Sequence, residues 1–321
     1  MKSSTAIAHP NIALIKYWGK LNTEGNIPAM SSISITLDVM ESKTKISFPS
    51  DLNEDTWILN GSKQSSLERI KMPFDELKKM SNVRDSCLIE SGNNFPTAAG
   101  LASSASGMAS LVMALSHALE LELSLQQMIE LAMLGSGSAP RSLFPGFVSL
   151  DVTGAKVTCS TIIEGNQWPL EIIVCITSSD QKQTSSREGM GISKKTSPLY
   201  DNWVGNHQKD IQIALTAIQS RNFEQLGTVV VDNCLKMHQV MKTSQPSIDY
   251  WNETTHAVVQ QVKSLQLQGW DIFYTIDAGP QVKIICNPDL TEEIAFERNK
   301  IHGIEYIVKC GLGQGARLID E

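Results

Sequence analysis

The side chain best placed for acid–base chemistry is Asp277. This carboxylate ends an apolar, strand-like stretch and comes immediately before the turn Gly279-Pro280. A carboxylate at such a strand end suits a general base that is held at a cleft. The same placement also suits an Asp that merely caps the turn. The residue pattern by itself leaves both interpretations open.

Two lysines and a tyrosine form a second group in residues 11–20, NIALIKYWGK. If this segment is a strand, Lys16 and Lys20 share one face, because side chains in a strand alternate with a period of two. The functional interpretation places one lysine near a carboxylate and the other against a phosphate, with Tyr17 close by. The alternative is a pair of surface lysines whose stems cover apolar surface.

Three further segments combine the backbone donors, hydroxyls and guanidinium groups that an anion site needs. Residues 96–105, PTAAGLASSA, lead into a predicted helix whose N-terminal N–H groups favour a phosphate chain. This is not a Walker A loop, because no Lys follows its glycine at that spacing. Residues 135–142, GSGSAPRS, include Arg141, which can bind a carboxylate bidentately, and residues 185–190, SSREGM, offer another anion clamp. Each segment also has a structural interpretation. Residues 96–105 could be small residues packed tightly at a helix, residues 135–142 a helix C-terminus, and residues 185–190 a solvated loop.

Hydrophobic periodicity predicts a β-rich N-terminal part followed by alternating helices and strands. The polar stretch 178–203 is typical of a mobile connection or an active-site loop between two lobes. Residues 271–286 read as one strand. Ser124 is the expected N-cap of a helix. The predicted helices cover residues 65–80, interrupted at Pro73, then about 103–119, 125–135, 207–222, 222–241 and 255–269.

Composition excludes several classes of protein. The 321 residues, 41% of them hydrophobic, can bury a sizeable core in two lobes or one large domain. A net charge of −7 argues against non-specific nucleic-acid binding, so a bound anion must meet a local group of cations. The six cysteines have no CxxC pair and indicate reduced, buried thiols rather than a zinc site or a disulfide scaffold.

Histidine placement and hydropathy exclude further classes. No HExxH or G-x-S-x-G motif occurs, so a triad hydrolase is unsupported, and we expect His9 and His238 to be structural. No apolar run approaches about 18 residues, the length that a membrane-spanning helix needs. We therefore expect a cytoplasmic protein.

The segments NIALIKYWGK, NNFPTAAGLASSASG, GSGSAPRS, SSREGM and DAGP, in this order, resemble the motifs of the GHMP kinase superfamily. Within it they are similar to those of the diphosphomevalonate decarboxylases, and the resemblance covers essentially the whole chain. It implies an α+β GHMP kinase fold with the active site between two lobes. These are a ribosomal protein S5 domain 2-like, ATP-binding lobe over 1–178 and a ferredoxin-like α+β lobe over 179–321.

The resemblance also implies a reaction and its partners. The family binds ATP and Mg²⁺, phosphorylates the tertiary 3-hydroxyl of diphosphomevalonate and then eliminates phosphate with CO₂. The product is isopentenyl diphosphate, in the mevalonate pathway of isoprenoid biosynthesis. A homodimer that binds a small-molecule substrate, and neither nucleic acid nor membrane, is the expectation.

Residue roles follow from the same resemblance. Asp277 would orient or deprotonate the tertiary hydroxyl, Lys16 would sit beside it, and Arg141 would hold the substrate carboxylate. The substrate pocket would be completed by Tyr17, Lys20, Ser136, Ser138, Ser186, Arg187 and Met190. The ATP phosphates would lie against Pro96, Ala99, Gly100, Leu101, Ala102, Ser103 and Ser104, with Ser91 near the nucleotide and Ser104 near Mg²⁺.

Three positions depart from the family pattern on the presumed substrate side. Met30 and Gln281 stand where Asn is usual, and Pro140 stands where Cys is common. The alternatives are therefore a phosphomevalonate decarboxylase and a mevalonate-type 3-kinase that stops after phosphorylation. A catalytically dead binding protein is disfavoured, because all three candidate catalytic residues are present.

Overall fold

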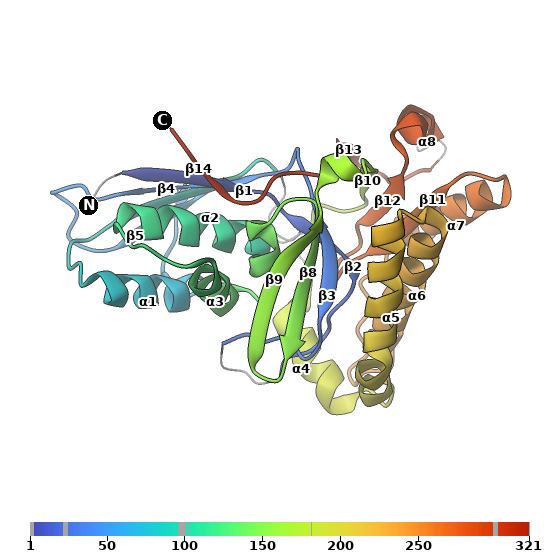
Figure 1. The fold of residues 1–321 in the computed structure, drawn as a ribbon, viewed down its shortest axis with the longest axis horizontal. Coiled ribbons are helices and arrows are strands. Elements are labelled where there is room, and N and C mark those ends of the chain that lie inside the picture. The colour runs from blue at the N-terminus through green and yellow to red at the C-terminus, as the bar shows by residue number, and fades with distance from the viewer. Residues whose placement is uncertain are drawn as a thin grey trace.

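The computed structural model describes residues 3–21, 25–95, 101, 103–180, 182–297 and 301–320. Its N-terminal half is built on a six-stranded sheet with α2 (Ser103–Ala118) packed against it and α1 (Lys71–Ser81) and α3 (Leu125–Gly135) beyond (Figure 1). Small and apolar residues of α2, such as Ala109 and Val112, are fully buried between these layers. The sheet order is β14 (Arg317–Ile319), β1 (Ser4–Ala8), β4 (Ser42–Ser47), β7 (Leu88–Asn93), β5 (Thr56–Leu59) and β6 (Ser62–Lys63).

A second sheet stands in the middle of the molecule (Figure 1). Its order is β2 (Asn11–Ile15), β3 (Ser32–Thr36), β8 (Phe147–Thr153) and β9 (Lys156–Ile163), all antiparallel. The short helix η1 (Ala139–Leu143) precedes β8. Both β2 and β3 are buried along their whole length, which brings residues 11–16 and 32 into the interior.

The third sheet carries the C-terminal half, in the order β11 (Ile272–Ile276), β12 (Val282–Cys286), β10 (Glu171–Ile176) and β13 (Tyr306–Cys310). Helix α6 (Phe223–Lys242) contacts both β2 and β11 and so joins this sheet to the central one. The remaining elements are η2 (Gly165–Gln167), α4 (Ser186–Thr196), α5 (Tyr200–Ser220), α7 (Glu253–Leu267), η3 (Pro288–Leu290) and α8 (Thr291–Glu297).

Several local predictions are confirmed. Ser124 caps α3, since its side chain accepts a hydrogen bond from Gln127 N–H in a capping box. All six cysteines are free and buried. One helix prediction is wrong: α1 begins at Lys71, so Pro73 lies in its first turn, where a missing N–H costs nothing, and does not interrupt the helix.

Two segments differ from their predicted structure. The stretch 178–203 contains α4 and the first residues of α5, because Ser185 caps α4 and Trp18 donates a hydrogen bond to Ser193 at 2.9 Å. The Ser185 cap is local, since its side chain accepts a hydrogen bond from Glu188 N–H, but the Trp18 contact comes from distant sequence, and local polarity could not reveal it. Residues 271–286 form the hairpin of β11 and β12, with Asp277 in the connection.

The condition under which Lys16 and Lys20 would share a face, a strand through residue 20, is not met. β2 ends at Ile15, and Gly19 has φ +127°, a conformation that turns the chain. Lys16 and Lys20 therefore do not share a strand face. Lys16 is buried inside the molecule, whereas Lys20 pairs with Pro28 in an isolated bridge.

The pairing of strands in the sheets indicates where along the chain the N-terminal lobe ends and the C-terminal lobe begins. β10, which a boundary at residue 178 assigns to the N-terminal lobe, pairs with β12 and β13 of the C-terminal half. In return, β14 at the C-terminus pairs with β1. The sheets thus favour a division before residue 171, with the last strand returning to the first lobe.

Gly19 gives a prediction on stability. A Cβ atom at this position would lie 1.9 Å from Tyr200 Oη, whose ring is buried, and the φ of +127° disfavours any L side chain. We expect Gly19→Ala to lower the free energy of unfolding by about 2 kcal/mol in urea denaturation. The matched control is Gly205→Ala in α5, where a Cβ meets nothing within 4 Å and should raise stability slightly. Equal stabilities for the two variants would contradict this account.

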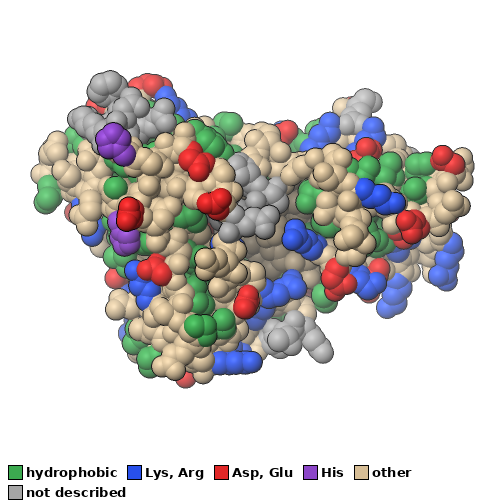
Figure 2. Space-filling model, turned by 180° about the vertical axis from the view of Figure 1, so that it is seen from behind, with side chains coloured by type: hydrophobic (Ala, Val, Ile, Leu, Met, Phe, Trp, Pro, Cys, Tyr) green, Lys and Arg blue, Asp and Glu red, His purple; other side chains and the backbone are tan. Residues whose placement is uncertain are grey.

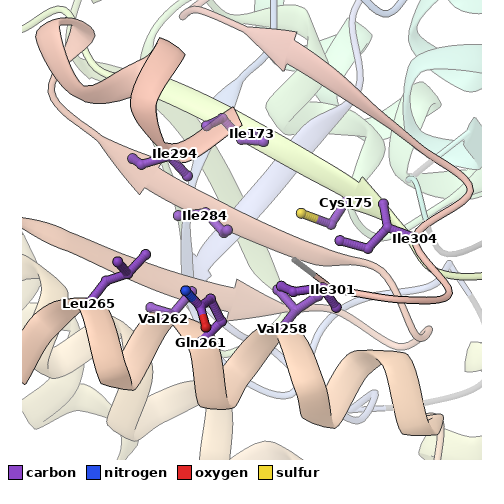
Figure 3. Close-up of a pocket in the computed structure, with 10 residues that line it drawn as sticks. All are labelled: Ile173, Cys175, Val258, Gln261, Val262, Leu265, Ile284, Ile294, Ile301 and Ile304. Carbon is purple, nitrogen blue, oxygen red and sulfur yellow. The ribbon is translucent and has the colours of Figure 1, made fainter. Parts of the chain in front are cut away.

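A small cavity lies between α7 and the third sheet (Figure 3). Isoleucine side chains from β10, β12 and α8 face Val258, Val262 and Leu265 of α7 across it. Its volume is about 10 Å³, room for roughly one water molecule. We interpret it as a packing gap in the core.

Candidate active site

The connection between β11 and β12 holds Asp277 between two buried lysines. Gly279 N–H donates to the Asp277 carbonyl at 2.8 Å, which closes a tight turn. Lys16 Nζ lies 2.7 Å from Asp277 Oδ1, and Lys283 Nζ lies 3.3 Å from Oδ2. Both lysine side chains are 1% exposed, whereas the carboxylate is 23% exposed. Each carboxylate oxygen therefore has its own cation, and the group still reaches solvent.

The electrostatics of this triad fix the charge of Asp277. Burial by itself raises the pKa of this carboxyl, but the charges and hydrogen bonds of Lys16 and Lys283 outweigh burial and lower the pKa to about 2. Asp277 is thus ionised throughout the physiological range. A carboxylate of such low pKa is a weak proton acceptor and a strong anchor for cations and hydroxyl groups.

Lys16 is held from behind by two helices. Its backbone N–H donates to Asn233 Oδ1 at 2.8 Å, and its Nζ donates to the Ala13 carbonyl at 2.7 Å. Asn233 Nδ2 in turn donates to Asp210 Oδ2 at 2.8 Å. Since Asn233 lies on α6 and Asp210 on α5, both helices set the place of this lysine.

Arg141 is buried and oriented by the central sheet. Its Nε donates to Asn11 Oδ1 at 2.9 Å, its Nη1 donates to Ser32 Oγ at 2.6 Å, and its guanidinium carbon lies 5.8 Å from the centre of the Tyr17 ring. A guanidinium has five N–H donors, so among the described residues these two bonds leave three for a ligand. Arg141 is also within electrostatic range of Asp277.

Further cations gather near Tyr17. Burial raises the pKa of Tyr17, although Arg141 and Arg187 act in the opposite direction, so its hydroxyl keeps its proton. Burial, together with the charge of Arg187, lowers the pKa of Lys20 to about 8. Lys20 Nζ donates to Asn26 Oδ1. A polyanion at this place would stabilise every one of these cations.

Lys182 is a third lysine near Asp277. Its Nζ donates to Ser186 Oγ at 2.7 Å and to the Ala278 carbonyl at 2.8 Å, and it lies 5.5 Å from the centre of the Tyr250 ring. Burial lowers the pKa of Lys182 to about 8, against the attraction of Asp277 and with the repulsion of Lys283. Burial therefore destabilises the positive charge of Lys182, and a bound phosphate group would stabilise that charge.

The predicted nucleotide and substrate segments meet at the start of α2. Ser104 Oγ, in the first turn of this helix, lies 3.5 Å from Ser136 Oγ, which lies 3.2 Å from Ser138 Oγ. Ser91 Oγ lies 3.1 Å from Thr44 Oγ1 on the neighbouring strand β4. Pro96, Ala99, Gly100 and Ala102 lie outside the described residues.

Other predicted site residues lie at different depths. Ser186 is the first residue of α4 and Arg187 is exposed beside it, but Met190 is buried among Trp18, Tyr200 and Trp203. Leu101 is buried too. The contacts of these residues with ligands stay predictions.

Sequence reasoning missed Lys283, Lys182, Asn11 and Ser32. Lys283 had a signal, because a lysine inside the apolar strand β12 needs a buried anion. Lys182 had no such signal, since it stands in a polar stretch.

His238 is buried beside the Ile276 carbonyl, and burial lowers its pKa to about 3, so its ring is neutral at physiological pH.

Lys283 gives a prediction on the pH dependence of any activity at this site. In Lys283→Met the pKa of Asp277 should rise, because one of its two cations is gone, and kcat should fall at least about 10-fold. Activity followed from pH 4 to 9 should decline on the acid side at a higher pH than in the wild type. The control is Lys309→Met, a lysine paired with Glu292 on the surface. An acid side that superimposes on the wild-type curve would contradict the role of Lys283.

The surface of the molecule fits an anionic ligand. One face is hollowed near its middle, and Lys and Arg side chains gather at the edge of the hollow (Figure 2).

Within the described residues, no three His, Cys, Asp or Glu side chains come together as a metal site. No helix in the described part of the chain is both long and apolar enough to cross a membrane.

Known proteins share the fold of this chain and about a third of its sequence. Residues 8–161 match the family model of the diphosphomevalonate decarboxylase-like N-terminal domain, and residues 172–316 match that of the mevalonate 5-diphosphate decarboxylase C-terminal domain. The diphosphomevalonate decarboxylase of Candida albicans is 33% identical over 100% of this chain and 99% of its own.

Solved structures agree with these matches. The mevalonate diphosphate decarboxylase of Staphylococcus aureus has a TM-score of 0.92 at 35% identity, over 99% of this chain and 98% of the other. A structure described as MDDEF in complex with MVAPP, AMPPCP and magnesium has a TM-score of 0.91 at 35% identity, over 99% of both chains. The α+β GHMP kinase fold is thereby confirmed, and the chain belongs to the diphosphomevalonate decarboxylase family.

Proposed function

We propose that this protein is an ATP-dependent diphosphomevalonate decarboxylase. It converts diphosphomevalonate and ATP into isopentenyl diphosphate, ADP, phosphate and CO₂. The observation that carries this proposal is the placement of Asp277 between Lys16 and Lys283, with Arg141 within electrostatic range. Together these groups supply an anchor for a hydroxyl, cations for a phosphoryl group and a fork for a carboxylate.

The first step is phosphoryl transfer to a tertiary alcohol, a poor nucleophile. Asp277 accepts a hydrogen bond from the substrate 3-hydroxyl and holds the hydroxyl oxygen in line with the terminal phosphorus of ATP. The new O–P bond forms as the bond to ADP breaks, and late in the transfer the hydroxyl proton, by then strongly acidic, passes to Asp277 and on to solvent. With a pKa of about 2, Asp277 orients the alcohol more than it deprotonates it. Such weak basicity suffices in a loose transition state, where positioning and electrostatic stabilisation dominate. Lys16 and Lys182 balance the charge on the transferring oxygens.

The second step uses the phosphate as a leaving group. When the C–O bond breaks, its electron pair departs with the phosphate, and the tertiary carbon becomes electron-deficient. The electrons of the neighbouring C–C bond then form the double bond, and CO₂ is released. Arg141 orients the carboxylate, but it must not stabilise the ground state more than the transition state.

The substrate's diphosphate fits the cations around Tyr17. Lys20 and Arg187 are close enough for their positive charges to repel each other, so a diphosphate between them would be stabilised. Ser186 and Ser138 add hydroxyl donors. A bound diphosphate would raise the pKa of Lys20 from about 8 towards its ordinary value. Binding should therefore take up protons near pH 8.

ATP fits the start of α2. The N-terminal N–H groups of this helix with Ser103 and Ser104 favour the phosphates. Mg²⁺ usually binds through phosphate oxygens, water and one or two protein oxygens, and the exposed hydroxyl of Ser104 is such an oxygen. Bound with ATP, Mg²⁺ neutralises charge on the β- and γ-phosphates.

Three broader features are part of the proposal. The chain comprises an N-terminal ATP-binding lobe and a C-terminal lobe, acts in the cytoplasm and forms a homodimer. Light scattering of the purified protein tests the dimer, since a mass near twice 35.2 kDa is expected. A mass equal to that of one chain would contradict the proposed homodimer.

The reaction is tested by supplying the purified protein with ATP, Mg²⁺ and one of three substrates: mevalonate, phosphomevalonate or diphosphomevalonate. We expect equal amounts of ADP, phosphate and CO₂ with diphosphomevalonate. A preference for the monophosphate would instead make the protein a phosphomevalonate decarboxylase. ADP formed without CO₂ would make it a 3-kinase.

A further inference from the structure

A buried amide ties together two segments behind the Asp277 turn. Gln281 is fully buried. Thr177 N–H donates to Gln281 Oε1 at 2.7 Å, and Gln281 Nε2 donates to the Ser178 carbonyl at 2.5 Å. One side chain thus spans a donor and an acceptor of the backbone that leaves β10.

The same network holds the turn itself. The Pro280 carbonyl accepts from Thr177 Oγ1 at 3.0 Å and from Thr255 Oγ1 at 2.7 Å. Asn252 Nδ2, at the N-cap of α7, donates to the Thr177 carbonyl at 3.1 Å. The Asp277 turn, the end of β10 and the start of α7 therefore form one hydrogen-bonded frame.

This frame leads to Lys182. Four residues after Ser178, the Lys182 ammonium group returns to the turn and donates to the Ala278 carbonyl at 2.8 Å. The segment that begins at Thr177 is thus attached to the Asp277 turn at two points, through Gln281 and through Lys182. Glu305 supports it between these points by accepting from Ser179 N–H at 3.1 Å.

We propose that Gln281 is a positioning residue that fixes residues 177–180 against the Asp277 turn. It thereby sets the place of the Lys182 ammonium group relative to the Asp277 carboxylate. This inference rests on the proposed function, because it concerns the phosphoryl transfer at that site. A misplacement of about 1 Å can cost 10²-fold in rate, so the effect of Gln281 should appear in kcat more than in KM.

The surroundings of Lys182 provide a direct readout. The groups that face it are the Asp277 carboxylate, the Lys283 ammonium, the Tyr250 ring and the Ser186 hydroxyl. Burial is the main reason that its pKa is lowered to about 8. If the segment detaches from the turn, water reaches Lys182 and its pKa should rise towards 10.5.

The experiment measures the pKa of Lys182 in the full-length protein by competitive acetylation from pH 6 to 11, read by mass spectrometry. The variants are Gln281→Ala, Gln281→Asn and Gln281→Glu. Asn is one methylene too short for both bonds, and Glu lacks the donor for the Ser178 carbonyl. The matched control is Gln126→Ala, which removes an amide bonded to the Val157 carbonyl in the N-terminal half.

We expect Gln281→Ala to raise the pKa of Lys182 by about 1 unit and to lower kcat about 10-fold or more. Gln281→Asn and Gln281→Glu should fall between it and the wild type, and Gln126→Ala should change neither quantity. A Lys182 curve that superimposes on the wild type in all three Gln281 variants would overturn the proposal, even if stability falls. If Gln281→Ala does not fold, Gln281→Asn decides by the same criterion.

The acetylation readout does not depend on turnover. If the wild-type protein releases no CO₂, the proposed function fails while the position of Lys182 is still measured. If CO₂ is released but the Lys182 curve does not move, only the role of Gln281 fails.

Discussion

Replacing Asp277 by Asn is expected to lower kcat by about 10³-fold while ATP still binds. Asn keeps the shape of the side chain but loses the charge that holds Lys16 and Lys283, which lie 2.7 and 3.3 Å from its oxygens. The tertiary alcohol then loses its anchor, and the cations lose the anion that places them. ADP, phosphate and CO₂ release give the rate, and titration with a fluorescent ATP analogue gives the nucleotide affinity.

The control for this variant is Asp232→Asn, which removes a surface carboxylate paired with Lys236. It should turn over at the wild-type rate, because exposed ion pairs contribute little. A near-normal rate in Asp277→Asn would show that the Asp277 carboxylate is not needed for the reaction. A variant that fails to bind ATP would show that the change reaches beyond the hydroxyl site.

The same variant should also be less stable in a pH-dependent way. Removing one partner of a buried ion pair costs about 3 kcal/mol, since two buried ammonium groups lose their counter-charge. The pKa of Asp277 is lowered from 3.8 to about 2, so its stabilisation is complete above pH 3.8 and is lost as the pH falls through 2. Urea unfolding should therefore separate wild type and variant most above pH 4, with the gap closing towards pH 2. A gap that widens on acidification would contradict this assignment.

The core of the site was predictable because charged side chains stood out in apolar sequence. Asp277 at the end of β11 and Lys16 after β2 are such residues, and the structure brings them together. Lys283 follows the same logic. The turn at Gly279-Pro280 indicates a hairpin, but interpreting residues 271–286 as one strand misses the return of Lys283 to Asp277. In a single extended strand, residues 277 and 283 would lie far apart.

What could not be predicted depends on contacts between distant segments. α4 has few apolar residues, and it is held in place by Trp18, whose indole N–H donates to Ser193 Oγ at 2.9 Å from a segment 175 positions away. Lys182 draws its importance from the Ala278 carbonyl, nearly a hundred residues away. The family resemblance supplied the reaction, whereas only the fold shows that Asn11 and Ser32 orient Arg141.

Replacing Arg141 by Lys is expected to lower kcat/KM for diphosphomevalonate by about 10²-fold or more. The guanidinium uses Nε and Nη1 for Asn11 and Ser32, at 2.9 and 2.6 Å, and lies against the Tyr17 ring. Its remaining donors can then meet a carboxylate in a fixed plane. A lysine ammonium is a point charge with three rotatable donors, so it cannot keep both anchors and still present a planar fork.

The loss should appear in CO₂ release, because the carboxylate must be aligned with the breaking C–O bond. The matched control is Arg221→Lys, an exposed arginine at the end of α5 that donates to the Gln167 carbonyl, and its kinetics should equal those of the wild type. Unfolding in urea, followed in parallel, separates misfolding from misalignment. An Arg141→Lys protein that folds and releases CO₂ at close to the wild-type rate would show that net positive charge suffices here and that the fork held by Asn11 and Ser32 is not required.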